Sequence, residues 1–198
     1  MNEESQTGVP QDPETESPQP EAPKDPKAAG LEFYSTLQSL VVVLSALVLI
    51  FTFLGRLISV DGISMVPTLL HGELMVVRSV GYTPQQGDIV VLTQPSFRDE
   101  AIVKRVIAKG GQRVDIDYTS GTVSVDGVVL DEPYINEPML PRGDVTSITV
   151  PDGFIFVMGD NRNVSADSRY DDVGVIDERR VLGKAEAVVF PFGHFAGL

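Results

Sequence analysis

The feature that most constrains this chain is a long uncharged segment near its N-terminus. Residues 33–55 carry no charged side chain, and residues 40–51 read LVVVLSALVLIF. As a helix the uncharged segment would be about 34 Å long, enough to cross a hydrocarbon core of about 30 Å. A buried core helix would show a polar face, and a cleaved signal peptide would have a basic start and a shorter apolar run. The sequence therefore predicts one uncleaved transmembrane helix over residues 33–58.

The composition on either side of this segment excludes several kinds of protein. Residues 1–32 are rich in Pro, Glu, Asp, Gln and Ser, which predicts a disordered acidic tail. The net charge of −13 argues against nucleic-acid binding, which needs clustered Lys and Arg. The chain has no Cys, so thiolate chemistry and sulfur-ligated metals are excluded. His71 and His194 are the two histidines and lie far apart, so a Ser-His-Asp triad is not favoured. We expect no metal or cofactor.

The chain after Val60 has the pattern of a β-rich domain. Its apolar runs are short, rich in β-branched residues and bounded by Gly and Pro, as strands are. The Asp126-Gly127 pair inside one alternating run predicts a two-residue hairpin turn. We therefore predict a mainly β domain over residues 59–198, large enough for its own core. The expected strands cover residues 74–77, 88–92, 101–107, 122–130, 147–150, 153–158 and 184–190.

Ser64 follows the apolar segment closely and stands in an unusual local sequence. Gly62 lets the chain bend two residues earlier, and Pro67 stiffens the chain three residues later. This pattern is typical of a serine whose hydroxyl is held away from the backbone, and a nucleophilic serine needs such a position. The alternative is an ordinary polar turn, because a motif as short as Gly-x-Ser also occurs in many turns without a catalytic role.

Lys104 lies in the middle of the apolar run over residues 101–107. In an extended strand it shares one face with Ile102 and Val106, whereas Arg105 points the other way. An ammonium buried on an apolar face is costly unless it loses its proton, so one interpretation is a general base with a lowered pKa. The other is an edge-strand lysine with a buried stem and an ammonium in water. The strand alone favours neither.

A polar turn over residues 159–169, GDNRNVSADSR, favours the first interpretation. Together with SMVPTL at residues 64–69, GDIVV at 87–91 and KRVI at 104–107, it resembles the type I signal peptidases. These are membrane-bound proteases with a Ser/Lys dyad that remove signal peptides from exported proteins. The motifs stand in the family's order, and the resemblance runs from the apolar segment to near the C-terminus. It implies a signal-peptidase-like β-rich catalytic domain of the Gram-positive type.

The resemblance also implies roles for individual residues. Ser64 would be the nucleophile and Lys104, as a neutral amine, its general base. Ser165 would hydrogen-bond the Lys104 amine, and Asp167 with Arg169 would form an ion pair that braces the turn. We expect a second ion pair between Asp160 and Arg105.

Substrate recognition by such a family member would involve residues on both sides of the dyad. Some relatives carry a serine two residues before the nucleophile, and Gly62 replaces it here, so the second donor to the oxyanion is not identified. An extended cleavage region would add to exposed strand edges, and small apolar pockets would accept the family's Ala-x-Ala pattern. The candidate wall residues implied by the resemblance are Met65, Leu69, Ile102 and Val103.

The resemblance implies a cell-membrane protein with a cytoplasmic N-terminus and an extracytoplasmic catalytic domain. Its partners would be exported preproteins and the lipid bilayer, close to the secretion translocon. Two alternatives stay open. One is a self-cleaving repressor-type protease with the same Ser/Lys chemistry, although such proteins lack the membrane span and the 159–169 turn. The other is a membrane-tethered β-domain that binds exported chains without cutting them.

Overall fold

The computed structural model describes residues 26–53, 55–192 and 196–198. Helix α1, Pro26–Phe53, forms where the apolar segment predicts a helix, with Pro26 in a first-turn position that tolerates proline. Its bounds differ from the expected 33–58, because residues 56–58 pair as a strand. Residues 1–25 of the predicted tail lie outside the described residues, and residues 26–32 are helical. No helix in the described part of the chain is both long and apolar enough for a membrane crossing.

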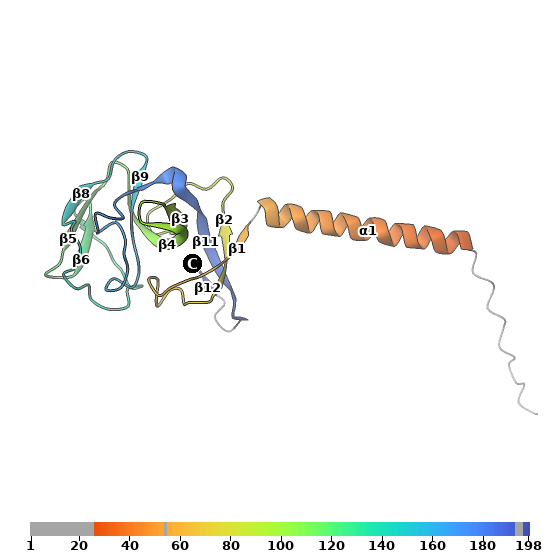
Figure 1. Ribbon diagram of the computed structural model, residues 1–198, viewed down its shortest axis with the longest axis horizontal. Helices are drawn as coiled ribbons and strands as arrows, with labels where there is room; N and C mark the ends of the chain where they lie inside the picture. The colour runs from red at the N-terminus through yellow and green to blue at the C-terminus, as the bar shows by residue number, and fades with distance from the viewer. Residues whose placement is uncertain (1–25, 54, 193–195) are drawn as a thin grey trace, which may run out of the picture. The chain divides into compact units, whose positions relative to one another are not determined.

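The remainder of the chain is mainly β, as predicted, and its larger sheet has eight strands (Figure 1). All of its strand pairs are antiparallel, and β4 lies between β3 and β9 near its middle. The sheet runs in the order β1 Arg56–Ser59, β2 Leu74–Arg78, β11 Val181–Phe190, β3 Ile89–Gln94, β4 Arg98–Lys109, β9 Phe154–Met158 and β10 Ile176–Asp177, with β12 Ala196–Gly197 paired to β11. A 3₁₀ turn, η1 Glu178–Arg180, leads into β11.

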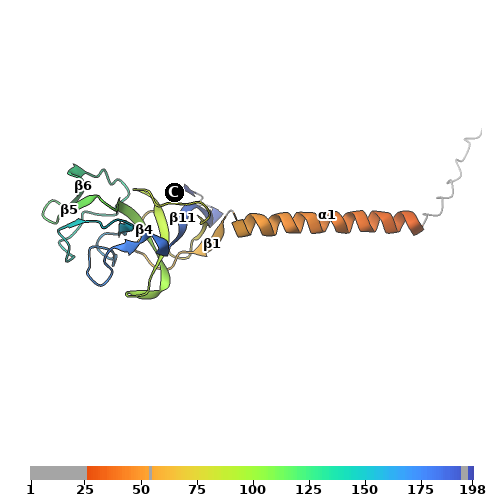
Figure 2. The same cartoon turned by 90° about the horizontal axis from the view of Figure 1, so that it is seen from above.

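A second, four-stranded sheet lies away from β1 and β11, at the far side of β4 (Figures 1 and 2). The predicted hairpin is present, because Asp126 and Gly127 both have positive φ, at 52° and 80°. The sequence does not predict β1, β10, β12 or the strand over Arg113–Asp117, because these strands are short or rich in charged residues. The order is β7 Val128–Val129, β6 Thr122–Val125, β5 Arg113–Asp117 and β8 Ser147–Thr149.

The register of β4 sets up the functional part of the molecule. Lys104 pairs with Val90 of β3, and Arg105 pairs with Met158, the last residue of β9. The turn that begins at Gly159 therefore starts directly beside Lys104 and Arg105. Buried apolar clusters cover both faces of β4: one includes Ile102 and Val106, and the other has Val103 packed against it.

Candidate active site

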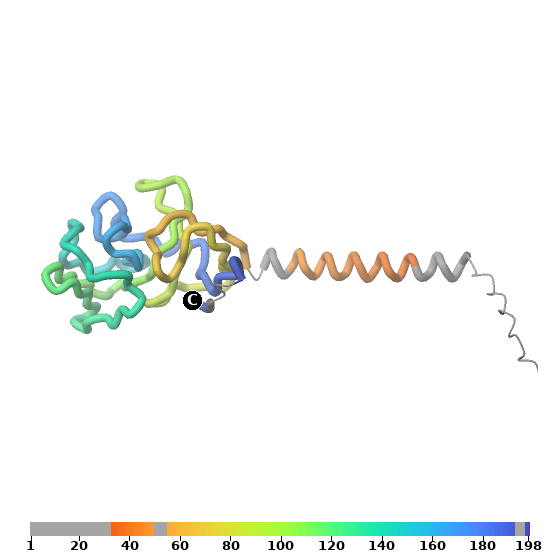
Figure 3. Tube along the Cα trace, turned by 90° about the horizontal axis from the view of Figure 1, so that it is seen from below, coloured from red at the N-terminus to blue at the C-terminus, as the bar shows by residue number. Residues whose placement is uncertain are grey.

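The loop that carries Ser64 leaves β1 and returns to β2 (Figure 3). Its two ends are joined by hydrogen bonds: the Val60 N–H donates to the Glu73 carbonyl at 2.8 Å, and the Gly72 N–H donates to the Val60 carbonyl at 2.9 Å. Gly62 has a φ of +103°, a backbone conformation that strongly favours glycine. The closed base and this bend hold Ser64 partly exposed above a buried core.

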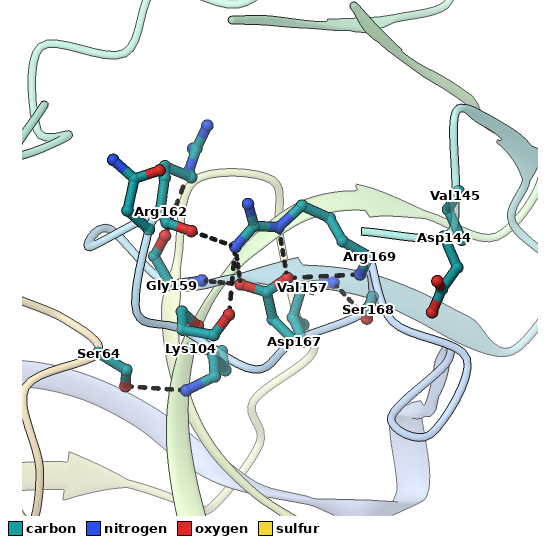
Figure 4. A network of polar contacts seen from close by, with 12 residues as sticks. Ser64, Lys104, Asp144, Val145, Val157, Gly159, Arg162, Asp167, Ser168 and Arg169 are labelled. Atoms are coloured by element: carbon teal, nitrogen blue, oxygen red, sulfur yellow. Dashed lines mark hydrogen bonds and ion pairs between the residues drawn. The ribbon is translucent and has the colours of Figure 1, made fainter. Parts of the chain in front are cut away.

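The Lys104 side chain meets Ser64 directly, with 2.9 Å between Lys104 Nζ and Ser64 Oγ (Figure 4). The amine also donates to the Val103 carbonyl at 3.1 Å. Lys104 is only 4% exposed and shares its buried face with Ile102 and Val106. Residues 40 positions apart are thus brought together as expected, and the edge-strand interpretation with a solvated ammonium is wrong.

Burial has a direct electrostatic consequence for this amine. It lowers the pKa of Lys104 from 10.5 to about 8, because the charged form loses its hydration. The Asp167 carboxylate opposes this change in pKa, whereas the guanidinium groups of Arg169 and Arg98 add to it. Near neutral pH a usable fraction of Lys104 is therefore uncharged and can accept a proton from Ser64.

The turn behind the dyad is braced by a buried ion pair. Arg169 donates from Nε and Nη2 to the two carboxylate oxygens of Asp167, at 2.7 and 2.9 Å, and both side chains are completely buried (Figure 4). The Gly159 N–H donates to the same carboxylate at 2.9 Å, and Arg169 Nη2 donates to the Arg162 carbonyl at 2.7 Å. Asp167 and Arg169 thus tie both ends of the turn together, as the resemblance implied.

Ser165 lies in this turn but does not make the expected bond to Lys104. Its side chain is buried, and its Oγ has no hydrogen-bond partner within the described residues. The reason is local packing. A Cβ placed on Gly159 would come within 2.3 Å of the Ser165 Oγ, so the hydroxyl lies against the glycine backbone, and the amine bonds Ser64 and Val103 instead.

Asp160 and Arg105 form the second expected pair and connect three parts of the site. Arg105 Nε and Nη2 donate to Asp160 at 2.8 and 2.6 Å. Thr68 Oγ1, from the loop that carries Ser64, donates to the same carboxylate at 2.5 Å. The Arg105 guanidinium also lies over the Tyr134 ring, 3.9 Å from its centroid. Asp160 therefore links β4 to the nucleophile loop.

Further supporting residues were not identified from the sequence. Asn161 holds the nucleophile loop from the other side: its N–H donates to the Ser64 carbonyl at 3.0 Å and its Nδ2 donates to the Ile63 carbonyl at 3.1 Å. Arg162 forms a two-point ion pair with Glu132, at 2.8 and 2.6 Å. Asn161 and Arg162 belong to the recognised motif over residues 159–169. Their partners lie about 100 and 30 residues away in the sequence, respectively, so the motif alone does not identify these contacts.

A cleft of about 520 Å³ opens over the dyad. Four of the five candidate substrate-binding residues line it, namely Gly62, Met65, Ile102 and Val103. The fifth, Leu69, is completely buried in the core beneath the loop, so its assignment as a wall residue is corrected. The other lining residues are Val60, Asp61, Ile63, Phe97, Arg98, Glu100, Ala101, Val164 and Ala166 together with the dyad.

The Ser64 N–H is a candidate donor to developing negative charge, because Ser64 lines the cleft. No acceptor bonds the Ser64 N–H among the described residues, so this group is free for an oxyanion. The neighbouring Gly62 N–H is already used, since it donates to His71 Nδ1 at 3.1 Å. Within the described part of the chain, no three His, Asp or Glu side chains come together to hold a metal.

Comparisons of the sequence with known proteins point to one family. The family described as "Signal peptidase, peptidase S26" matches residues 33–190. The chain is 38% identical to a probable signal peptidase I-1 of Synechocystis, over 82% of this chain and 84% of that protein. It is 34% identical to signal peptidase I of Bacillus amyloliquefaciens, over 90% of this chain and 96% of that protein.

Two further matches come from Staphylococcus aureus and Enterococcus faecalis. Signal peptidase IB of Staphylococcus aureus is 33% identical over 83% of this chain and 93% of that protein. A crystal structure of signal peptidase I from Enterococcus faecalis aligns with a TM-score of 0.45 and 32% identity, over 52% of this chain and 97% of that chain. From the family match and the long alignments with the Synechocystis, Bacillus and Staphylococcus proteins, the chain belongs to the signal peptidase family, peptidase S26.

Proposed function

We propose that this serine endopeptidase removes N-terminal signal peptides from exported preproteins, with Ser64 as nucleophile and Lys104 as general base. The observation that carries the proposal is the 2.9 Å contact between Ser64 Oγ and the buried Lys104 Nζ. When Lys104 is protonated it donates to Ser64. When it is neutral, its lone pair accepts the Ser64 proton, and the oxygen becomes a competent nucleophile.

The reaction follows from this geometry. Ser64 Oγ attacks the carbonyl carbon of the scissile bond while Lys104 takes its proton, and the Ser64 N–H stabilises the oxygen that becomes negative. Lys104 then passes the proton to the departing amine, which leaves an ester between the signal peptide and Ser64. A water molecule, deprotonated by Lys104, hydrolyses the ester and restores the enzyme.

Substrate choice would rest on the cleft above the dyad. The walls that Met65, Ile102 and Val103 contribute are apolar, and the edges beside the dyad are extended backbone. We expect an extended cleavage region with small side chains, of the Ala-x-Ala type, to add its backbone to these edges. Gly62 leaves open space where a side chain would stand, since a Cβ there would meet nothing within 4 Å.

Our proposal places the enzyme at the cell membrane, beside the translocon that delivers its substrates. The support is the uncharged segment over residues 33–55 and the exposed apolar side chains along α1, where Leu40, Val42 and Val48 are all more than half exposed. A signal peptide's cut site emerges on the outer face. The catalytic domain would therefore lie outside the cytoplasm, with the acidic N-terminus inside and the lipid bilayer as a partner.

A labelled preprotein incubated with the full-length protein in detergent or lipid tests the activity. We expect one cut after a small residue, confirmed by sequencing the new N-terminus, and no cut with Ser64→Ala. Cutting of the enzyme alone, with preproteins untouched, would favour a self-cleaving protease. Stable binding of preproteins without any cut would favour a binding domain.

The pH dependence provides a second test. Because the pKa of Lys104 is about 8, its neutral fraction falls tenfold for each pH unit below that value. We therefore expect kcat/KM to decline with unit slope on the acid side of about pH 8. A rate that stayed level down to pH 6 would contradict a lysine base.

A further inference from the structure

A second groove of about 460 Å³ lies next to the catalytic cleft. Phe97, Val164 and Ala166 line both, so the two grooves share a wall. Phe97 and Val164 are well exposed at this shared wall, 40% and 55% respectively. A polypeptide lying over the dyad can therefore place a neighbouring side chain in the second groove.

The second groove differs from the first in its chemistry. Its apolar part consists of the shared wall with Val173 and the Tyr170 ring, and its charged residues are Arg142 and Asp172. Arg142 and Asp172 make no ion pair with each other or with any other described residue. Two opposite charges in one groove without mutual neutralisation leave both free for a ligand.

Arg142 lies beside the segment that carries the shared wall. Its Nη1 lies 3.5 Å from the carbonyl oxygen of Asn163, the residue just before Val164. Asn163 is itself fixed, because its side chain accepts from the Leu140 N–H at 2.8 Å and donates to the Pro138 carbonyl at 3.1 Å. Asp172 lines only the second groove and precedes Val173, whose carbonyl accepts from Gln94 at 2.6 Å. A side chain that passes over Val164 thus lies close to the Arg142 guanidinium.

We propose that this groove is an additional substrate subsite, in which Arg142 selects a carboxylate side chain of the preprotein close to its cleavage site. The guanidinium presents parallel N–H donors that match a carboxylate, and the apolar wall accommodates the methylenes of a glutamate. The subsite rests on the proposed function, since it binds a further part of the same substrate, outside the small pockets over the dyad.

The test uses a set of peptide substrates with one variable position, scanned from four residues before the cut to three after it. Each position carries Glu, Gln or Lys. With the wild type we expect Glu to exceed Lys in kcat/KM by roughly two- to fivefold at one position, the range of an exposed ion pair. Arg142→Glu should reverse the preference at that position alone, and Arg142→Gln should remove it.

Arg113→Glu is the matched control, because it changes the charge equally on β5, away from both grooves. It should leave the preference unchanged. Raising the salt concentration should reduce the wild-type preference. The subsite is excluded if Arg142→Glu cuts all the substrates with the wild-type ranking. Absence of any Ser64-dependent cut would instead reject the proposed function and the subsite with it.

Discussion

Replacing Lys104 with Arg should lower kcat/KM by about 10²–10⁴-fold, the contribution of a positioned general base. The reason is that arginine stays protonated at every accessible pH, so it can donate to Ser64 but never accept its proton. The measurement is cleavage of a preprotein under single-turnover conditions, with the wild type in parallel. Substantial activity in Lys104→Arg would exclude the lysine as the base.

The matched control is Lys104→Met, whose unbranched side chain is one atom shorter than lysine and carries no charge. The fall of the Lys104 pKa from 10.5 to about 8 corresponds to about 3 kcal/mol of folding free energy, at 1.36 kcal/mol per pH unit. This cost is fully present below pH 8 and disappears as the pH rises from 8 to 10.5. At pH 7 we therefore expect Lys104→Met to be inactive yet more stable in urea unfolding. A less stable variant would show that the charge is not costly here.

The second large effect concerns the buried pair behind the dyad. Asp167→Asn should destabilise the fold by about 3–5 kcal/mol, because it leaves the Arg169 guanidinium buried without its counter-charge. Arg169 Nη1 has no hydrogen-bond partner among the described residues, so little is available to replace the lost carboxylate. Equilibrium unfolding in urea measures the change.

Asp167→Asn has a second readout that a purely structural residue would not affect. The Asp167 carboxylate raises the pKa of Lys104, so its removal should lower that pKa below 8 and move the acid limb of kcat/KM to lower pH. Arg113→Gln, which breaks the exposed pair with Asp115, should change neither stability nor pH profile. An unchanged acid limb in folded Asp167→Asn would contradict the electrostatic link.

Some of the site follows from simple alternation and residue type. The β-branched runs predict most of the strands, and the period of two along β4 correctly separates Lys104 from Arg105. The Asp126-Gly127 turn follows from its local chemistry, because only certain residues tolerate positive φ at both positions. In each case the interaction is local, so a short window of sequence contains its cause.

The parts that could not be predicted depend on how distant segments meet. Two contacts join segments that are far apart in the sequence. Asn161 donates hydrogen bonds to the carbonyls of Ile63 and Ser64, and Arg162 forms an ion pair with Glu132. The orientation of the Ser165 hydroxyl depends on the space left by Gly159, and the burial of Leu69 depends on the closure of its loop. Strand β5 carries Arg and Asp at alternate positions, which conceals its two buried apolar residues.

The pairing of β4 with β3 and β9 has a consequence for how this enzyme tolerates insertions and deletions. If β4 slipped by one residue toward its β3 end, Arg105 would take the position of Lys104. The permanently charged Arg105 guanidinium would then face the Ser64 hydroxyl, and the Lys104 amine would lie on the opposite face of the strand. Removing one residue from the tip joining β3 and β4, with the pairing closed up behind it, is therefore expected to give a folded but silent protein, because Arg105 would take the place of Lys104. Catalysis would then depend on the number of residues between the two strands of a hairpin as well as on the identity of the dyad.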